Sequence, residues 1–194
     1  MNIDQLKECL GCEVLGNKEK RFSWLNVVHS AYKRPKKRFL FWWRIANYLY
    51  LSEGRYAIKL ARLINRKLYF KYNTEIELGA QIGPGLYIGH HAGIVVTRRC
   101  KIGRNFTLRQ NTTIGLKTDN SNTVTIGNNV NLGANSCIIS EHLVIGDNVT
   151  IGAGAFVNHD IPANSTYYSL NHSYIRAKEI PASGDNSLVV DHEA

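Results

Sequence analysis

Cysteine, proline and methionine are scarce in this chain, which has 4 Cys, 4 Pro and 1 Met among 194 residues. Four cysteines are too few for a disulfide framework in a chain of this size, so we expect a reducing, cytoplasmic environment. Cys9 and Cys12 form one CxxC without a second pair. This spacing indicates two thiols on a short helical stretch rather than a zinc or redox centre.

Long apolar runs are also missing. No run approaches the roughly 18 residues that span a bilayer, and the N-terminal "MNIDQLKECLG" lacks the apolar region of a signal peptide. Apolar residues make up 44% of the chain and charged residues 20%, which is ordinary for a folded domain. The sequence therefore predicts one core with a smaller appendage.

Acidic residues are outnumbered, 15 to 24, which gives a net charge of +9. Basic and aromatic residues gather in "YKRPKKRFLFWWRIANYLYL", residues 32–51. Such a segment can bind single-stranded nucleic acid, lie on an anionic membrane, or pack its aromatic side against its own domain. No nucleic-acid motif accompanies it, so we expect no nucleic-acid partner. Packing, and peripheral contact with the inner face of the membrane, both stay open.

Two regions of the chain have different periods. In residues 1–72 apolar residues recur at helical spacing, as in "WLNVVHSAYKR" and "GRYAIKLARLINRKLYFKY". Pro35 and Gly54 separate the expected helices. We therefore predict a helical N-terminal region over residues 1–72, with a different fold over residues 73–166 and a polar tail over residues 167–194.

The second region repeats every six residues, and glycine follows many of the repeated aliphatic residues. A period of six fits short strands joined by tight turns, with three strands in each coil of roughly 18 residues. We therefore predict a parallel β-helix of between four and five coils. Two extra residues lie between Ile88 and Val96, and "LKTDNSNT" indicates a loop ejected from a coil. The repeated aliphatic positions are Ile76, Ile82, Ile88, Val96, Ile102, Leu108, Ile114, Ile126, Leu132, Ile138, Ile145, Ile151 and Val157.

Four segments carry a family resemblance: "EIELGAQIGPGLYIGHHAGIVV", "IGRNFTLRQNTTIG", "IGNNVNLGANSCI" and "IGDNVTIGAGAFVNHDIP". They resemble the left-handed β-helix acyltransferases, in particular serine acetyltransferase and the relatives that O-acetylate bacterial surface polysaccharides. The resemblance runs over residues 75–166 and more loosely over the helices before them. It implies a mainly β fold, a left-handed parallel β-helix preceded by a small helical region, and a homotrimer.

Two adjacent histidines stand out in the repeat. Counting repeats, we expect His90, Gln110 and Asn128 to stack on one edge, with coils about 4.7 Å apart. A neutral imidazole there can accept a proton near pH 7. The resemblance places His90 on the family's general base, which lets the acceptor hydroxyl attack acetyl-CoA directly, and Glu75 on the aspartate that orients it. For His91 a packing role and contact with donor or acceptor stay open.

The predicted acceptor follows from two departures from serine acetyltransferase. The aspartate before its catalytic histidine is Gly89 here, and its second active-site histidine falls at Gln110. A neutral edge with Gln110 and Asn111, beside His91, suits a sugar hydroxyl of a surface polysaccharide or its lipid-linked precursor. Serine O-acetylation, as in cysteine biosynthesis, and a non-catalytic β-helix scaffold are the alternatives.

The resemblance also implies a donor site. The family binds the pantetheine arm between subunits along small residues, which would be Gly115, Ala134 and Ala153 here, with Lys117 of the ejected loop covering the arm. The family's Gly-x-Pro-Ala-Lys/Arg turn is replaced in "STYYSLNHSYIRAK", residues 165–178. We expect acetyl-CoA as co-substrate, no permanently bound cofactor and no metal, since the histidines lack ligand spacing.

Overall fold

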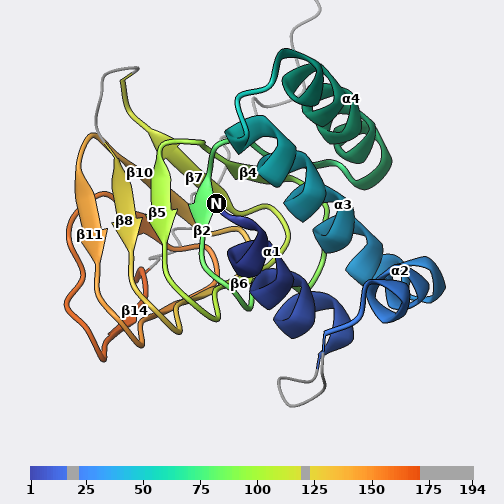
Figure 1. Ribbon diagram of the computed structural model, residues 1–194. Helices are drawn as coiled ribbons and strands as arrows, with labels where there is room; N and C mark the ends of the chain where they lie inside the picture. Colours follow the sequence, from blue (N-terminus) through green and yellow to red (C-terminus); the bar gives the residue numbers. More distant parts are fainter. Residues whose placement is uncertain (17–21, 119–122, 171–194) are drawn as a thin grey trace, which may run out of the picture.

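The computed structural model describes residues 1–16, 22–118 and 123–170. A layer of helices lies against one end of a triangular stack of strands (Figure 1). The helices are α1 (Ile3–Leu10), a π-helical turn η1 (Gly11–Leu15), α2 (Trp24–Lys33), α3 (Pro35–Leu51) and α4 (Arg55–Tyr72). The chain passes from helix to strand between Tyr72 and Thr74.

Short strands follow one another through the rest of the described chain. They are β1 (Thr74–Ile76), β2 (Gln81–Ile82), β3 (Tyr87–Ile88), β4 (Ile94–Val96), β5 (Cys100–Ile102), β6 (Thr107–Leu108), β7 (Thr113–Leu116), β8 (Val124–Ile126), β9 (Asn131–Leu132), β10 (Cys137–Ser140), β11 (Leu143–Ile145), β12 (Thr150–Ile151), β13 (Phe156–Val157) and β14 (Thr166–Tyr167).

The strands form three parallel sheets, in the orders β1-β4-β7-β10-β13, β11-β8-β5-β2 and β14-β12-β9-β6-β3. Each coil gives one strand to each sheet, so β1 to β12 make four coils. A fifth coil contains β13 and β14, and between them a bridge joins Ile161 to Ile145. The predicted parallel β-helix, preceded by a small helical region, is confirmed.

Stacked aliphatic side chains fill the interior. In the first sheet the strand registers place Ile76, Val96, Ile114, Ile138 and Val157 on successive coils. All five are fully buried. The residues beside them point outward, since side chains alternate along a strand. The six-residue period is therefore the period of this inward stack.

Asparagines stabilise one corner of the triangle. Asn105, Asn129, Asn148 and Asn164 all have positive φ, between 55° and 60°, a conformation that Asn tolerates better than most residues. Each side chain donates a hydrogen bond to the next, over 2.9, 2.9 and 2.8 Å. The corner is thus held by a ladder of amides as well as by the backbone.

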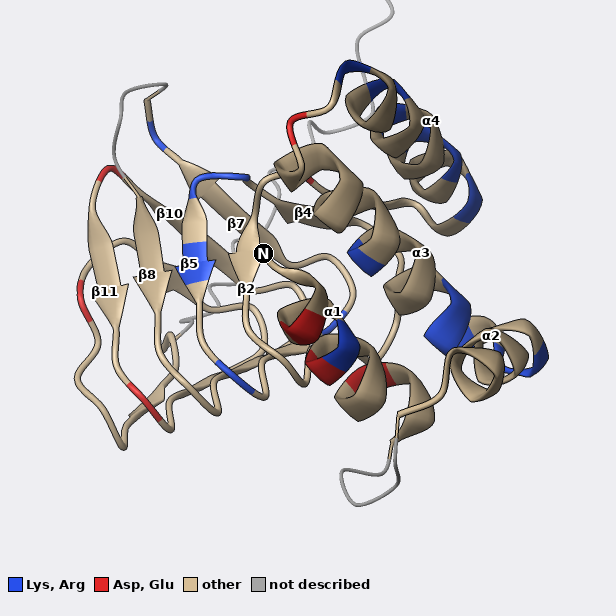
Figure 2. Cartoon of the chain, in the orientation of Figure 1, with Lys and Arg blue, Asp and Glu red and all other residues tan. Residues whose placement is uncertain are grey.

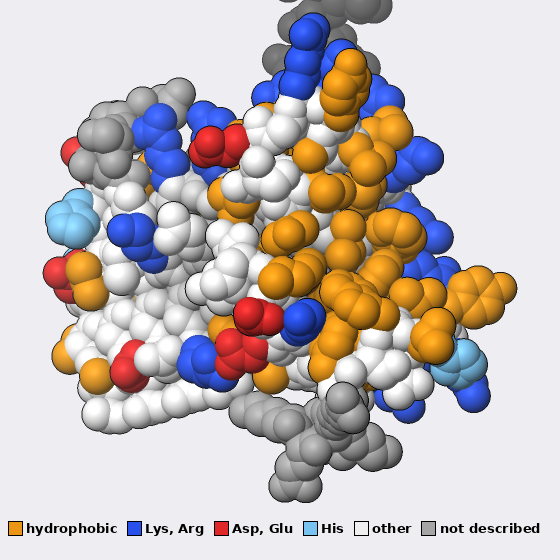
Figure 3. Space-filling model, in the orientation of Figure 1, with side chains coloured by type: hydrophobic (Ala, Val, Ile, Leu, Met, Phe, Trp, Pro, Cys, Tyr) orange, Lys and Arg blue, Asp and Glu red, His pale blue; other side chains and the backbone are white. Residues whose placement is uncertain are grey.

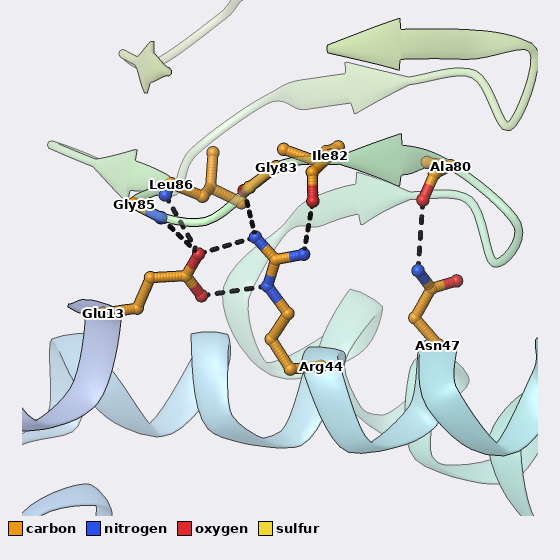
Figure 4. A network of polar contacts seen from close by, with 8 residues as sticks. All are labelled: Glu13, Arg44, Asn47, Ala80, Ile82, Gly83, Gly85 and Leu86. Carbon is orange, nitrogen blue, oxygen red and sulfur yellow. Dashed lines mark hydrogen bonds and ion pairs between the residues drawn. The ribbon is translucent and has the colours of Figure 1, made fainter. Parts of the chain in front are cut away.

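The open edge of the first coil is covered by charged side chains from the helices (Figure 4). Buried Arg44 of α3 donates to the carbonyl oxygens of Ile82 (2.7 Å) and Gly83 (2.8 Å). The same guanidinium makes two hydrogen bonds to Glu13, of 2.9 and 2.6 Å. Exposed strand edges invite pairing with other chains, and these contacts occupy this one.

Glu13 completes the contact from the acceptor side. One of its carboxylate oxygens accepts from the backbone N–H groups of Gly85 (3.1 Å) and Leu86 (2.9 Å). The ion pair is therefore hydrogen-bonded on both sides, which a buried pair needs because its desolvation is costly.

Two further side chains of α3 bind the same edge. Asn47 donates to the Ala80 carbonyl (3.1 Å) and accepts from the Gly79 N–H (2.8 Å). The indole N–H of Trp43 donates to the Ile76 carbonyl (3.1 Å). Helix α3 thus fixes the helical layer against the β-helix.

The packing of α3 tests the two alternatives left open for residues 32–51, packing and membrane contact. Phe39, Leu40, Phe41 and Trp43 are buried, whereas Trp42 is half exposed. The packing alternative is correct for these buried side chains, which are not free to lie on a membrane. Within the described ranges, no helix is both long and apolar enough to cross a bilayer.

The CxxC cysteines lie in α1 and η1, and both thiols are free. Burial raises the pKa of the Cys9 thiol to about 11. A thiol that stays protonated is a poor nucleophile and metal ligand, in agreement with the packing interpretation. Residues 119–122 of the predicted loop at residues 116–123, and the tail beyond residue 170, lie outside the described residues.

Candidate functional site

One corner of the β-helix collects four of the predicted site residues. Strands β3, β6, β9 and β12 are neighbours in one sheet, and their registers place each strand directly on the next. The residue two positions beyond each strand therefore leaves the sheet at the same corner, once per coil. Those residues are His90, Gln110, Ala134 and Ala153. We refer to this corner as the site ridge.

His90 stands on a bulge of the site ridge. The turn Gly89–Gly93 holds the two extra residues of the first coil, and its two ends are fixed to neighbouring backbone. The N–H of Gly89 donates to the Leu108 carbonyl (2.9 Å), and the N–H of Gly93 donates to the Asn73 carbonyl (2.9 Å). The Thr74 hydroxyl donates to the carbonyl of the third residue of the turn. A fixed turn thus holds an exposed imidazole on the outer surface.

His91 has a different environment. Its ring lies between Phe39 of α3 and Tyr72 of α4, with centroid distances of 4.7 and 5.1 Å. Its buried Nε2 has no hydrogen-bond partner among the described residues. Burial lowers the pKa of His91, and the positive charges of Lys36 and His90 lower it further. A neutral, packed His91 joins the helices to the bulge, and its contact with a ligand stays a prediction.

Glu75, the predicted partner of His90, points outward from β1, where it is in register with Val95 of β4. No hydrogen bond or ion pair joins Glu75 to His90 within the described part of the chain. Glu75 lines a cleft of about 480 Å³ between α4 and the first sheet, and Arg62, Arg66 and Arg98 line the same cleft. Its orienting role stays a prediction.

The predicted polar edge is only partly assembled. Gln110 is half buried on the site ridge. Asn111 has a positive φ of 54° and donates to the side chain of Asn135 (2.9 Å), so it belongs to a second asparagine ladder. Asn128 is not on this edge. It follows β8, in another sheet, and accepts from the backbone N–H of Arg104 (2.8 Å).

The predicted donor residues fall into two groups. Ala134 and Ala153 lie on the site ridge, whereas Gly115 and Lys117 lie at the end of β7 in the first sheet. A side chain at Gly115 would meet only ordinary contacts, at 3.9 Å. Gly133, one position before Ala134, differs because a Cβ there would lie 2.6 Å from the Gly152 carbonyl carbon. Gly133 is therefore required by the fold, and Gly115 is not.

Gly89 also has room for a side chain. A Cβ there would lie 3.7 Å from the Leu108 oxygen and 3.8 Å from the Tyr87 ring, and no positive φ constrains it. The absence of a carboxylate before His90 is thus not forced by the fold. In the described residues no group of three or more His, Cys, Asp or Glu side chains could hold a metal ion.

Comparison with known proteins bears on this site. Residues 123–159 match the sequence model described as the hexapeptide repeat of succinyl-transferase. The chain carries a hexapeptide-repeat β-helix.

Serine acetyltransferase of Staphylococcus xylosus is 38% identical over 116 residues, covering 50% of this chain and 52% of the relative. Serine acetyltransferase of Bacillus subtilis is 34% identical over 125 residues, covering 63% and 56%. The chain thus spans about half the length of these curated relatives.

Solved structures agree on the fold. Soybean serine acetyltransferase complexed with serine superposes with a TM-score of 0.71 at 23% identity, covering 86% of this chain and 68% of that one. Serine acetyltransferase isoform 3 of Entamoeba histolytica, in complex with cysteine, gives 0.69 at 23% identity, covering 91% and 61%. At this identity the likeness shows the fold alone.

Sequence reasoning missed the residues that hold the bulge. Thr74 and Asn73 reach it from the start of the β-helix, and Phe39 and Tyr72 reach it from α3 and α4. The available signal was the pair of extra residues between Ile88 and Val96. Two residues inserted into a repeat must leave the coil, and the buried side of such a bulge needs partners.

Proposed function

We propose that this protein is an acetyl-CoA-dependent O-acetyltransferase with His90 as its general base. The observation that carries the proposal is the site ridge. An exposed imidazole on an anchored bulge stands at the corner where Gln110, Ala134 and Ala153 follow on successive coils. The serine acetyltransferase relatives support the reaction class.

The reaction needs one base and no covalent enzyme intermediate. His90 removes the proton of the acceptor hydroxyl as its oxygen attacks the thioester carbonyl of acetyl-CoA. The tetrahedral intermediate then collapses, the C–S bond breaks, and the CoA thiolate takes up the proton that His90 holds. Positioned proton transfer of this kind contributes roughly 10²- to 10⁴-fold to a rate. Glu75 would orient the imidazole, which requires its carboxylate to reach the ring.

Donor binding would use the surfaces that carry the small residues. Ala134 and Ala153 let the backbone of the site ridge approach a pantetheine arm closely, and Gly115 leaves the end of β7 open. Lys117, exposed beside Gly115, would meet the phosphates of CoA. A homotrimer would place the site ridge of one subunit against its neighbour and close this groove.

L-serine is the first acceptor to test, because the curated relatives are serine acetyltransferases. The sugar acceptor expected from the sequence finds no support in these comparisons. It stays the second candidate because of one observation. Gly89 provides no carboxylate to bind the ammonium group of serine, although the structure has room for a side chain at that position.

The test is thiol release from acetyl-CoA by the purified full-length chain, with L-serine and, separately, with a panel of bacterial surface glycans. His90→Ala should lower kcat by about 10²-fold or more. His91→Ala is the matched control: it removes the neighbouring imidazole and should lower stability more than kcat.

Serine-dependent release that His90→Ala abolishes would support a serine acetyltransferase, and glycan-dependent release would support the second candidate. If His90→Ala keeps the wild-type rate, the assignment of the base is wrong. No release with any acceptor, together with no binding of acetyl-CoA, would favour a non-catalytic scaffold.

A further inference from the structure

Positive charge is concentrated in helices α2 to α4. Residues 24–72 contain 12 Lys and Arg but only one acidic residue, Glu53, whereas residues 73–170 contain six of each sign. Figure 2 shows the basic residues along the outer side of α4 and around α2 and the start of α3. Helices α2 to α4 therefore present a positive surface to solvent, while the β-helix is balanced.

Helix α4 also exposes apolar side chains on its solvent face. Tyr56, Leu60, Leu63 and Phe70 are 83%, 49%, 41% and 76% exposed. Their spacing of four, three and seven residues aligns them as one stripe along the helix. The buried residues of α4 lie on its opposite side, so the stripe does not serve packing within the chain. We call it the α4 stripe.

Cations flank the α4 stripe on both sides. At 100° per residue, Lys59 and Arg66 fall on one side of it, with Arg55 and Arg62 beyond them. Lys67 falls within the line of the stripe, between Leu63 and Phe70, and Lys71 falls on the side of the stripe toward α3. All six are exposed, and α4 carries no acidic residue. An apolar stripe bordered by Lys and Arg is the pattern of a helix that lies in a membrane interface.

A small cavity continues this surface between α4 and α3. Its volume is about 270 Å³, its walls include Trp42, Ile64 and Leu68, and Arg38, Lys67 and Lys71 also line it. Trp42 is 41% exposed. Apolar walls with three cations nearby suit the boundary between lipid headgroups and acyl chains. Figure 3 shows hydrophobic side chains gathered over the helical layer, with Lys and Arg at their edge.

We propose that the α4 face docks on an anionic phospholipid surface, with the α4 stripe in the headgroup region and the flanking cations on lipid phosphates. Charge decides the occupant. A second copy would bring like charges together along both flanks, and nucleic acid would leave the aliphatic part of the stripe without apolar contact. An anionic bilayer satisfies both the cations and the stripe.

The test is flotation of the full-length protein with vesicles of phosphatidylcholine, alone and mixed with phosphatidylglycerol. Binding is expected only to the anionic vesicles and should fall with salt. Lys59→Gln/Arg66→Gln should weaken it on the order of twentyfold, and Phe70→Gln on the order of tenfold. Lys101→Gln/Arg109→Gln and Phe156→Gln are the matched controls, with exposed residues of the same kinds on the β-helix.

A second readout is the fluorescence of Trp42 in a Trp24→Phe background. Since Trp43 is buried, a blue shift on anionic vesicles reports entry of Trp42 into lipid. No binding to anionic vesicles, or equal losses in the controls, overturns the proposal. If Phe70→Gln instead lowers the mass of the particle in light scattering, the α4 stripe is an interface between copies and the proposal is wrong.

Discussion

The ion pair between Arg44 and Glu13 gives the sharpest prediction about how the fold is held. Arg44→Met keeps most of the side-chain volume but removes the charge and all five donors of the guanidinium. The change breaks two hydrogen bonds to Glu13 and leaves the carbonyl oxygens of Ile82 and Gly83 without their donor. Both charged side chains are almost completely buried, so water cannot replace the lost contacts without opening the helical layer.

The expected cost follows from this geometry. Removing one partner of a buried ion pair costs about 3–5 kcal/mol, because the remaining charge stays desolvated. The two carbonyl groups that lose their donor place the cost above the lower end of that range. We therefore expect Arg44→Met to lose about 4 kcal/mol of unfolding free energy, which lowers Tm by roughly 10 °C in a chain of this length.

The control is a double-mutant cycle. Glu13→Gln/Arg44→Met removes the stranded charge, while the amide oxygen introduced at position 13 can still accept from the N–H groups of Gly85 and Leu86. The double variant should be more stable than Arg44→Met by at least ~1 kcal/mol. Urea unfolding at one fixed protein concentration measures all four corners, since subunit association would shift the midpoint. A loss below ~1 kcal/mol for Arg44→Met, or simple additivity, would refute the reasoning.

Further predictions concern the site ridge. Burial lowers the pKa of His91, so His91 binds a proton more readily in the unfolded chain than in the folded one. Stability should therefore fall as pH drops below about 6.5. His91→Phe should make this loss smaller, as measured by thermal unfolding between about pH 7.5 and about pH 5. Gly115→Leu should raise KM for acetyl-CoA while leaving Tm unchanged, whereas Gly133→Ala should lower Tm, and the reverse pattern would contradict the donor site. Gly89→Asp should fold normally, and a rise in kcat/KM for L-serine would show that the missing carboxylate limits that acceptor.

The β-helix was predictable because its rule is local and repeated. Every coil buries an aliphatic residue on each face, so the period of six is written many times, and single departures do not hide it. The asparagine ladders follow from the same repetition, as positions such as Asn129 and Asn148 recur at equivalent turns. A fold specified by repeats needs no knowledge of distant contacts.

The same period explains the error at Asn128. Counting Asn120 as a repeat places Ile126 three steps after Leu108, on the same face. In the structure Ile126 belongs to β8, in a different sheet from Leu108 in β6. An insertion of about one repeat length keeps the six-residue spacing of the aliphatic residues in the sequence. It nevertheless shifts every later residue by one face of the triangle from the face that counting predicts. Periodicity alone cannot detect it.

The contacts that close the first coil could not be predicted for the opposite reason. Glu13, Arg44 and Leu86 are far apart in the sequence, and nothing near them marks Arg44 as buried among the many basic residues of its region. Its partners exist only once α3 lies across the coil. A similar limit applies to the aromatic residues: composition identified the basic, aromatic segment 32–51, but only packing showed that Trp43 is buried while its neighbour Trp42 is 41% exposed.

His90 and His91 bring these limits together. They are the same residue type, adjacent, in one insertion, and nothing local separates them. The insertion forces the chain out of the coil, and the side chains of two successive residues then point to different sides of the bulge. One side meets Phe39 and Tyr72, which stack on His91, while His90 remains exposed on the site ridge. The helices therefore determine which of the two imidazoles is exposed, and removing Phe39 and Tyr72, rather than either histidine, tests this. Phe39→Ala/Tyr72→Ala should return the pKa of His91 toward its ordinary value in an NMR titration, and an unchanged His91 titration would show that the aromatic pocket does not hold it.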